Sequence, residues 1–96
     1  MEDLLSYVLP WAQQNREPVA DITFRCFMYI EKNAGLLSRY NTLIAAEGAT
    51  PQARQTVNQN IAKRIESELG LSSTGRECNL PAGMFLINSY SILQEK

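Results

Sequence analysis

The segment TPQARQTVNQNIAKRIESELG, residues 50–70, decides the fold, because it contains a complete helix with both of its end signals. Thr50 is a good N-cap, and Pro51 suits the first helical position, where its missing amide proton removes no intrahelical bond. Gly70 is a typical residue for ending the helix. Apolar residues recur every four positions between these ends: Val57, Ile61, Ile65 and Leu69. The pattern predicts an amphipathic helix over 51–69 that buries one side.

Three more helices are predicted upstream, from apolar residues three and four positions apart. The first ends by about Asn15 and should kink or restart at Pro10, which has no amide donor. The second begins at Asp21, a good N-cap, and its dense apolar composition leaves a strand over 22–29 as the alternative. The third covers 36–47 and is closed by Gly48.

Downstream of Gly70, residues 72–79 have the composition of a loop, and Asn79 and Pro81 can open a last helix. In that helix Leu86, Ile87, Tyr90 and Leu93 would face inward, whereas a short strand at Met84–Ile87 is the alternative. We therefore expect an all-α fold, in which four or five short helices form one compact bundle and a single domain over 1–96.

Composition excludes several functional classes. With 45% hydrophobic and 20% charged residues, the 96-residue chain has a globular balance, and its net charge of −1 gives no field that favours DNA or an anionic membrane. No apolar run reaches membrane-spanning length, and Met1-Glu2-Asp3 is acidic where a secretory signal is basic. Two widely separated cysteines, Cys26 and Cys78, fit reduced thiols in a cytoplasmic protein.

The chain contains no histidine, which removes the commonest general base and the commonest metal ligand. Cys26 and Cys78 form no Cys-x-x-Cys motif, and Cys78 is the more reactive candidate of the two. Residues 73–77 could cradle a phosphate, but they lack a Walker pattern and a preceding predicted strand. The sequence thus predicts a protein that is not an enzyme and uses no cofactor or metal.

The first functional hypothesis is a protein-interaction domain, an accessory or adaptor module that self-associates, because many apolar residues lie on short helices. Two-fold pairing is the commonest form of self-association, so we expect a homodimer. The candidate interface lies either on the first predicted helix, at Leu5, Leu9 and Trp11, or on the last one, at Phe85, Tyr90 and Ile92.

The alternative is a DNA-binding regulator that uses the polar face of helix 51–69, since no acidic residue occurs between Gly48 and Ile65. Amide and guanidinium groups can read base edges in a major groove. The order of helix 36–47, Gly48 and helix 51–69 suits a helix-turn-helix, although Glu47 and Arg54 occupy positions where its compact form needs apolar residues. A plain solvated face also explains the candidate contacts: Gln52, Arg54, Gln55, Gln59, Lys63 and Arg64.

One polar residue carries a structural prediction. Asn58 lies between Val57 and Ile61, on the side of the helix that is expected to be buried. An unpaired buried amide costs about 1–3 kcal/mol. We therefore expect the Asn58 side chain to bond a backbone group, for which the end of a neighbouring helix is a candidate.

Overall fold

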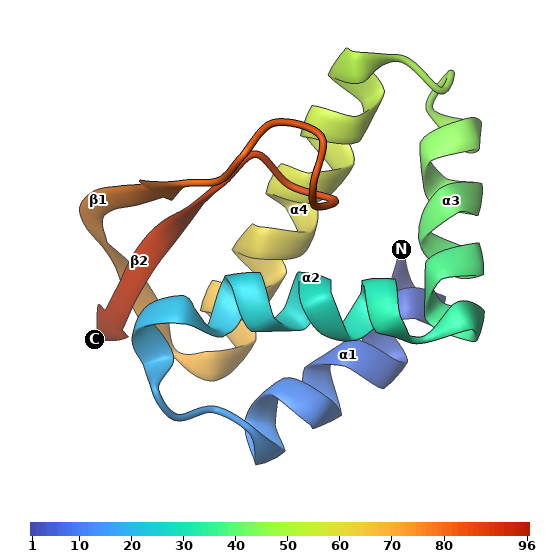
Figure 1. The fold of residues 1–96 in the computed structure, drawn as a ribbon. Helices are drawn as coiled ribbons and strands as arrows, with labels where there is room; N and C mark the ends of the chain where they lie inside the picture. The colour runs from blue at the N-terminus through green and yellow to red at the C-terminus, as the bar shows by residue number, and fades with distance from the viewer.

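The computed structural model describes all of residues 1–96 and is mostly helical, with one small antiparallel sheet (Figure 1). Its elements, in chain order, are α1 (Glu2–Gln14), the 3-10 helix η1 (Val19–Asp21), α2 (Ile22–Lys32), α3 (Ala34–Ala46), α4 (Pro51–Leu69), β1 (Leu71–Asn79) and β2 (Ser89–Glu95). The helical architecture expected from the sequence is confirmed for residues 1–70. The fold is not strictly all-α, because the last quarter of the chain forms the two strands.

Helix α4 has the predicted ends. The Thr50 hydroxyl accepts a 3.0 Å hydrogen bond from the amide of Ala53, which satisfies one free amide of the first turn. Gly70 adopts the left-handed conformation at φ 66°, which a residue without a Cβ reaches at little cost. The predicted apolar stripe is buried together with one further residue: Ala53, Val57, Ile61, Ile65 and Leu69.

The other helices differ in detail from the sequence pattern. Helix α1 runs through Pro10 without restarting, and α2 replaces the alternative strand over 22–29. The Asp21 side chain makes no capping bond; it accepts instead from the Arg25 side chain at 2.9 Å. Asn33 ends α2 and also caps α3, because its side-chain oxygen accepts from the Leu36 amide.

The C-terminal quarter corrects two predictions. Residues 71–79 are a strand rather than a loop, and the expected helix over 79–93 is wrong. The alternative of a short strand is confirmed for this part of the chain but not at Met84–Ile87, since these residues lie between the strands and β2 begins at Ser89. In the register Leu71 pairs with Glu95 and Glu77 with Ser91. Backbone hydrogen bonds between the paired strands hold the two polar segments together. The spacing of apolar residues within either segment does not reveal this pairing.

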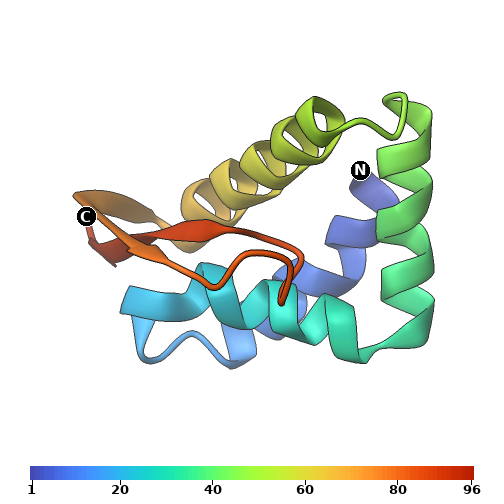
Figure 2. The ribbon, with the colours of Figure 1, turned by 45° about the horizontal axis from the view of Figure 1, so that its top comes forward.

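The core joins all four helices to the sheet. Eighteen buried residues form one cluster, and its two largest side chains, Phe27 and Tyr40, meet edge to face with ring centroids 6.5 Å apart. Figures 1 and 2 show α3 and α4 joined at one end of the molecule, with the two strands on the far side of α4 from α3. No helix has the length and apolar character needed to cross a membrane. The arrangement leaves the polar side of α4 facing the turn that precedes β2.

Candidate functional site

A cleft of about 530 Å³ separates α4 from the segment that leads into β2. Gln52, Gln55 and Gln59 line it from α4, and residues 86–91 form the opposite wall. Leu86 is half-buried and contributes apolar surface, while most of the other lining groups are amides and hydroxyls. Figure 2 shows the segment that leads into β2 running below α4, with the turn before it in front of α2. The cleft therefore offers many neutral hydrogen-bonding groups next to apolar surface.

Asn58 fixes the two walls of this cleft to each other. Its side-chain oxygen accepts a 2.6 Å hydrogen bond from the Tyr40 hydroxyl of α3, and its amide nitrogen donates to the Leu86 carbonyl at 3.0 Å. Burial raises the pKa of Tyr40, although Arg54 and the bond to Asn58 act in the opposite direction. The prediction that Asn58 bonds a backbone group is confirmed, and its partner belongs to the turn before β2.

Charged groups in the cleft are few and unpaired. Arg54 makes no ion pair and lies over the Tyr40 ring, with its guanidinium carbon 5.9 Å from the ring centroid. Glu66 of α4 and Glu77 of β1 also line the cleft, and neither has a cationic partner. One cation and two carboxylates thus remain available to a ligand.

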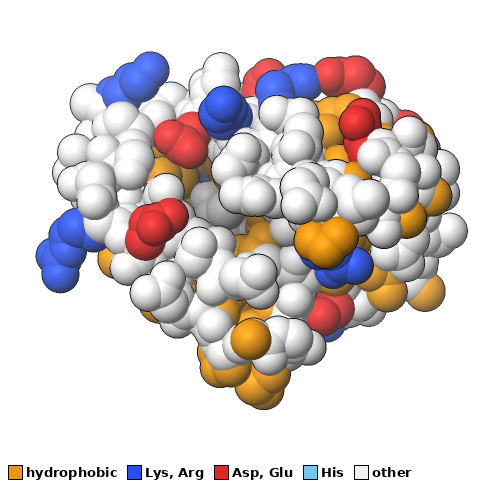
Figure 3. Space-filling view, turned by 90° about the horizontal axis from the view of Figure 1, so that it is seen from above, with side chains coloured by type: hydrophobic (Ala, Val, Ile, Leu, Met, Phe, Trp, Pro, Cys, Tyr) orange, Lys and Arg blue, Asp and Glu red, His pale blue; other side chains and the backbone are white.

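The six candidate DNA contacts line two different hollows. Gln52, Arg54, Gln55 and Gln59 line the cleft, whereas Lys63 and Arg64 line a separate hollow beside Met1 and Leu43. Arg64 is engaged by two carboxylates, those of Glu2 on α1 and Glu68 on α4. From above, Lys and Arg side chains are scattered among acidic ones over a largely uncharged surface (Figure 3).

The six candidate interface residues separate in a similar way. Phe85 and Tyr90 meet around Phe24 of α2, with ring centroids 5.4 and 5.3 Å from that of Phe24. These three half-buried rings form what we call the aromatic cluster, and Met84, next to Phe85 in the chain, is 63% exposed. Tyr90 also lines the cleft, so the cluster and the cleft are continuous.

The remaining interface candidates lie elsewhere. Leu5 is only 1% exposed and belongs to the core, so it cannot contact a partner. Trp11 is half-buried and stacks on Tyr29 with ring centroids 4.4 Å apart. Leu9 and Ile92 are half-buried as well.

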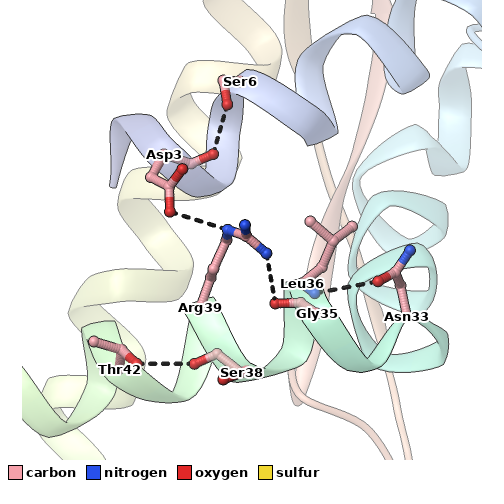
Figure 4. Close-up of polar contacts among 8 residues, drawn as sticks. All are labelled: Asp3, Ser6, Asn33, Gly35, Leu36, Ser38, Arg39 and Thr42. Atoms are coloured by element: carbon pink, nitrogen blue, oxygen red, sulfur yellow. Dashed lines mark hydrogen bonds and ion pairs between the residues drawn. The ribbon is translucent and has the colours of Figure 1, made fainter.

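Arg39 and Asp3 form a polar contact away from the cleft (Figure 4). The Arg39 Nε donates to an Asp3 carboxylate oxygen at 3.0 Å, and its Nη1 donates to the Gly35 carbonyl at 3.0 Å. The guanidinium also lies over the Tyr7 ring, 4.8 Å from its centroid. These bonds hold α1 against α3, so Arg39 has a structural role.

The other candidate sites are the segment 73–77, the two cysteines and a metal-binding cluster. Residues 73–77 belong to β1, where the Ser73 and Thr74 hydroxyls accept from the amides of Gly75 and Arg76, so these amides are not free for a phosphate. Both cysteines are free thiols, and burial raises the pKa of Cys26 to about 12. No three His, Cys, Asp or Glu side chains are grouped so that they could hold a metal ion.

Sequence reasoning missed the opposite wall of the cleft. Asn88, Ser89, Ser91 and Glu77 line it only because the two strands pair and bring them beside α4. Their polar composition was visible, but it was typical of any loop.

Comparison with family models, curated proteins and solved structures finds no match to this chain.

Proposed function

We propose that this chain is a small non-enzymatic protein-interaction domain whose contact surface is the cleft together with the aromatic cluster. One observation carries the proposal: two sets of residues, singled out from the sequence for different reasons, converge on one place. Gln52, Gln55 and Gln59 form one wall of the cleft, and Phe85 and Tyr90 belong to the cluster at its side.

The lining of the cleft suits an extended segment of another protein. Neutral amides and hydroxyls can pair with the alternating donors and acceptors of a peptide backbone, which carries one of each per residue. Leu86 is half-buried and offers an apolar contact beside them, whereas Phe27 and Ile87 are only 2% and 4% exposed. The volume of about 530 Å³ lies within the usual range for ligand-binding clefts. Aromatic rings at the side add the residue type that is enriched in protein interfaces.

DNA binding through α4 remains the alternative, and the geometry supports it less. A recognition helix must project into a major groove, whereas Gln52, Gln55 and Gln59 face residues 86–91 across the cleft. Glu66 and Glu77 would add repulsion between this surface and phosphates.

The test uses a phage-displayed library of random peptides, panned on the wild-type chain. Gln55→Trp places a large ring in the cleft from an exposed position and should abolish peptide enrichment. Thr56→Trp is the matched control, because Thr56 is the next residue of α4, is exposed and lies outside the cleft lining.

Enriched peptides that bind the wild type and Thr56→Trp, but not Gln55→Trp, support the proposal. Equal enrichment on all three proteins, or none on any, contradicts it. A short DNA duplex tested on the same proteins addresses the alternative, for which binding should weaken steeply as salt is raised.

A further inference from the structure

We infer that the cleft takes an extended peptide segment with a charge at each end: a Lys or Arg side chain at Glu66 and Glu77, and a carboxylate at Arg54. This inference rests on the proposed function and adds the chemistry of the partner. It starts from the unequal distribution of charge along a cleft whose other polar lining groups are neutral.

The three charged groups are free to bind a partner. Within the protein, acidic side chains pair with Arg16, Arg25, Arg39 and Arg64, whereas Arg54, Glu66 and Glu77 enter no ion pair. Arg54 and Glu77 are exposed and Glu66 is half-buried. A ligand with complementary charges would therefore gain ion pairs without breaking any that exist.

The charges lie at opposite ends of the cleft. Arg54 and Glu66 are twelve positions apart on α4, which at the helical rise corresponds to about 18 Å. The α4 residues that line the cleft begin at Pro51 and end at Glu66. An extended chain advances about 3.3 Å per residue, so about five or six residues span the distance.

The path of the strands places Glu77 toward the Glu66 end. The sheet begins where Leu71 follows α4 directly, and the turn beyond the sheet reaches α4 at Asn58, which bonds the Leu86 carbonyl. Glu77 pairs with Ser91 between these two points, and both residues line the cleft. Both carboxylates are thus displaced from Arg54 in the same direction.

The geometry favours a cationic side chain over a metal ion at the two carboxylates, because no group of three His, Cys, Asp or Glu side chains is formed there. The neutral amides and hydroxyls between the charged ends are suited to backbone groups of the same segment. A single small anion or cation would use only one end of the cleft.

The test uses fluorescent six-residue peptides with blocked termini, whose interior residues come from the peptides enriched on the wild-type chain. One peptide has Lys first and Glu last, the second has the reverse order, and a third has Gln at both ends. Binding is followed by fluorescence polarisation. One of the two charged peptides should bind about three- to tenfold more tightly than the neutral one, an advantage that shrinks as salt is added.

Matched variants show which charged group of the cleft binds each end of the peptide. The double variant Glu66→Gln/Glu77→Gln should remove the advantage of the peptide's Lys, and Arg54→Gln should remove that of its Glu. Glu17→Gln/Glu31→Gln is the control, because it changes net charge equally at two unpaired carboxylates outside the cleft. It should leave the binding preference unchanged.

The outcomes separate the two claims. The proposed charge pattern is wrong if peptides bind in the cleft but the neutral peptide binds as tightly as both charged ones. It is also wrong if the control variant lowers affinity as much as Glu66→Gln/Glu77→Gln does. In both cases the proposal of an interaction domain still stands. If no peptide shows binding that depends on Gln55, both claims fail together.

Discussion

Asn58 connects three parts of the molecule through one side chain. It accepts from Tyr40 on α3 and donates to the Leu86 carbonyl in the turn before β2. The spacing of α4 was enough to predict a buried amide with a backbone partner, because position along a helix fixes the direction of a side chain. It did not identify Leu86 or Tyr40, which are brought to Asn58 by tertiary packing.

Replacing Asn58 with Ala should lower the free energy of unfolding by about 1–3 kcal/mol, since the variant leaves the Tyr40 hydroxyl and the Leu86 carbonyl without their partner. Urea unfolding followed by circular dichroism measures the loss. Tyr40→Phe removes one bond only and should cost less, about 0.5–1.5 kcal/mol. The costs of the two substitutions should not add in the double variant, because they share a bond. Fully additive costs would show that the Tyr40–Asn58 bond contributes nothing.

Cys26 makes the free energy of unfolding depend on pH in the alkaline range. The side chain is fully buried, and burial raises its pKa from 9.0 to about 12 because the thiolate is poorly solvated. The folded protein therefore keeps a proton that the unfolded chain loses above pH 9.0. The stabilisation is complete below that pH and is lost as the pH rises toward about 12, with a slope of at most about 1.4 kcal/mol per pH unit.

Urea unfolding at several alkaline pH values tests this effect against the variant Cys26→Ala. The variant should be less stable than the wild type at neutral pH, because it leaves a cavity. The difference in stability should narrow above about pH 9, since only the wild type carries the buried thiol. A difference that stays constant at all pH values would mean that Cys26 titrates alike in the folded and unfolded states.

At the scale of elements, the helices could be predicted from the sequence and the strands could not. Helix α4 was bounded correctly because Thr50, Pro51 and Gly70 are local signals that act within one turn. The strands depend on pairing between residues that are 10 (Asn79 with Ser89) to 24 (Leu71 with Glu95) positions apart, and the register contains an irregularity between Ser73 and Glu77. The spacing of residues within one segment does not indicate which other segment it pairs with.

The same contrast explains which part of the cleft was visible in advance. The α4 wall was identified as a polar helix face, although it was assigned to DNA contacts. For the opposite wall the sequence predicts a helix instead, because Leu86, Ile87, Tyr90 and Leu93 have helical spacing. In the structure only Ile87 and Leu93 of these four are buried, and they support the turn and β2. A helical spacing of four apolar residues is too short to exclude a turn followed by a strand.

At the scale of the whole molecule, the accessible surface area is that expected for a compact chain of this size. The accessible area is 5519 Å², and the area expected for a compact monomer of 10.8 kDa is about 5,500 Å². The radius of gyration of 12.6 Å likewise matches the value of about 12.5 Å expected for a chain of this length. The chain is therefore as compact as expected for a protein of this size.

We expect self-association to be weak and concentration-dependent, with the aromatic cluster and Met84 as its candidate surface. We expect sedimentation equilibrium to give the monomer mass at micromolar concentration and a rising average mass toward millimolar concentration. Met84→Ser should suppress the rise, because it removes a side chain that is 63% exposed beside the cluster. Tyr7→Ser is the control, since Tyr7 is 50% exposed on α1 outside the cluster. A dimer that persists at micromolar concentration would contradict this prediction. If a peptide that binds in the cleft lowers the average mass, peptide binding and self-association use the same surface.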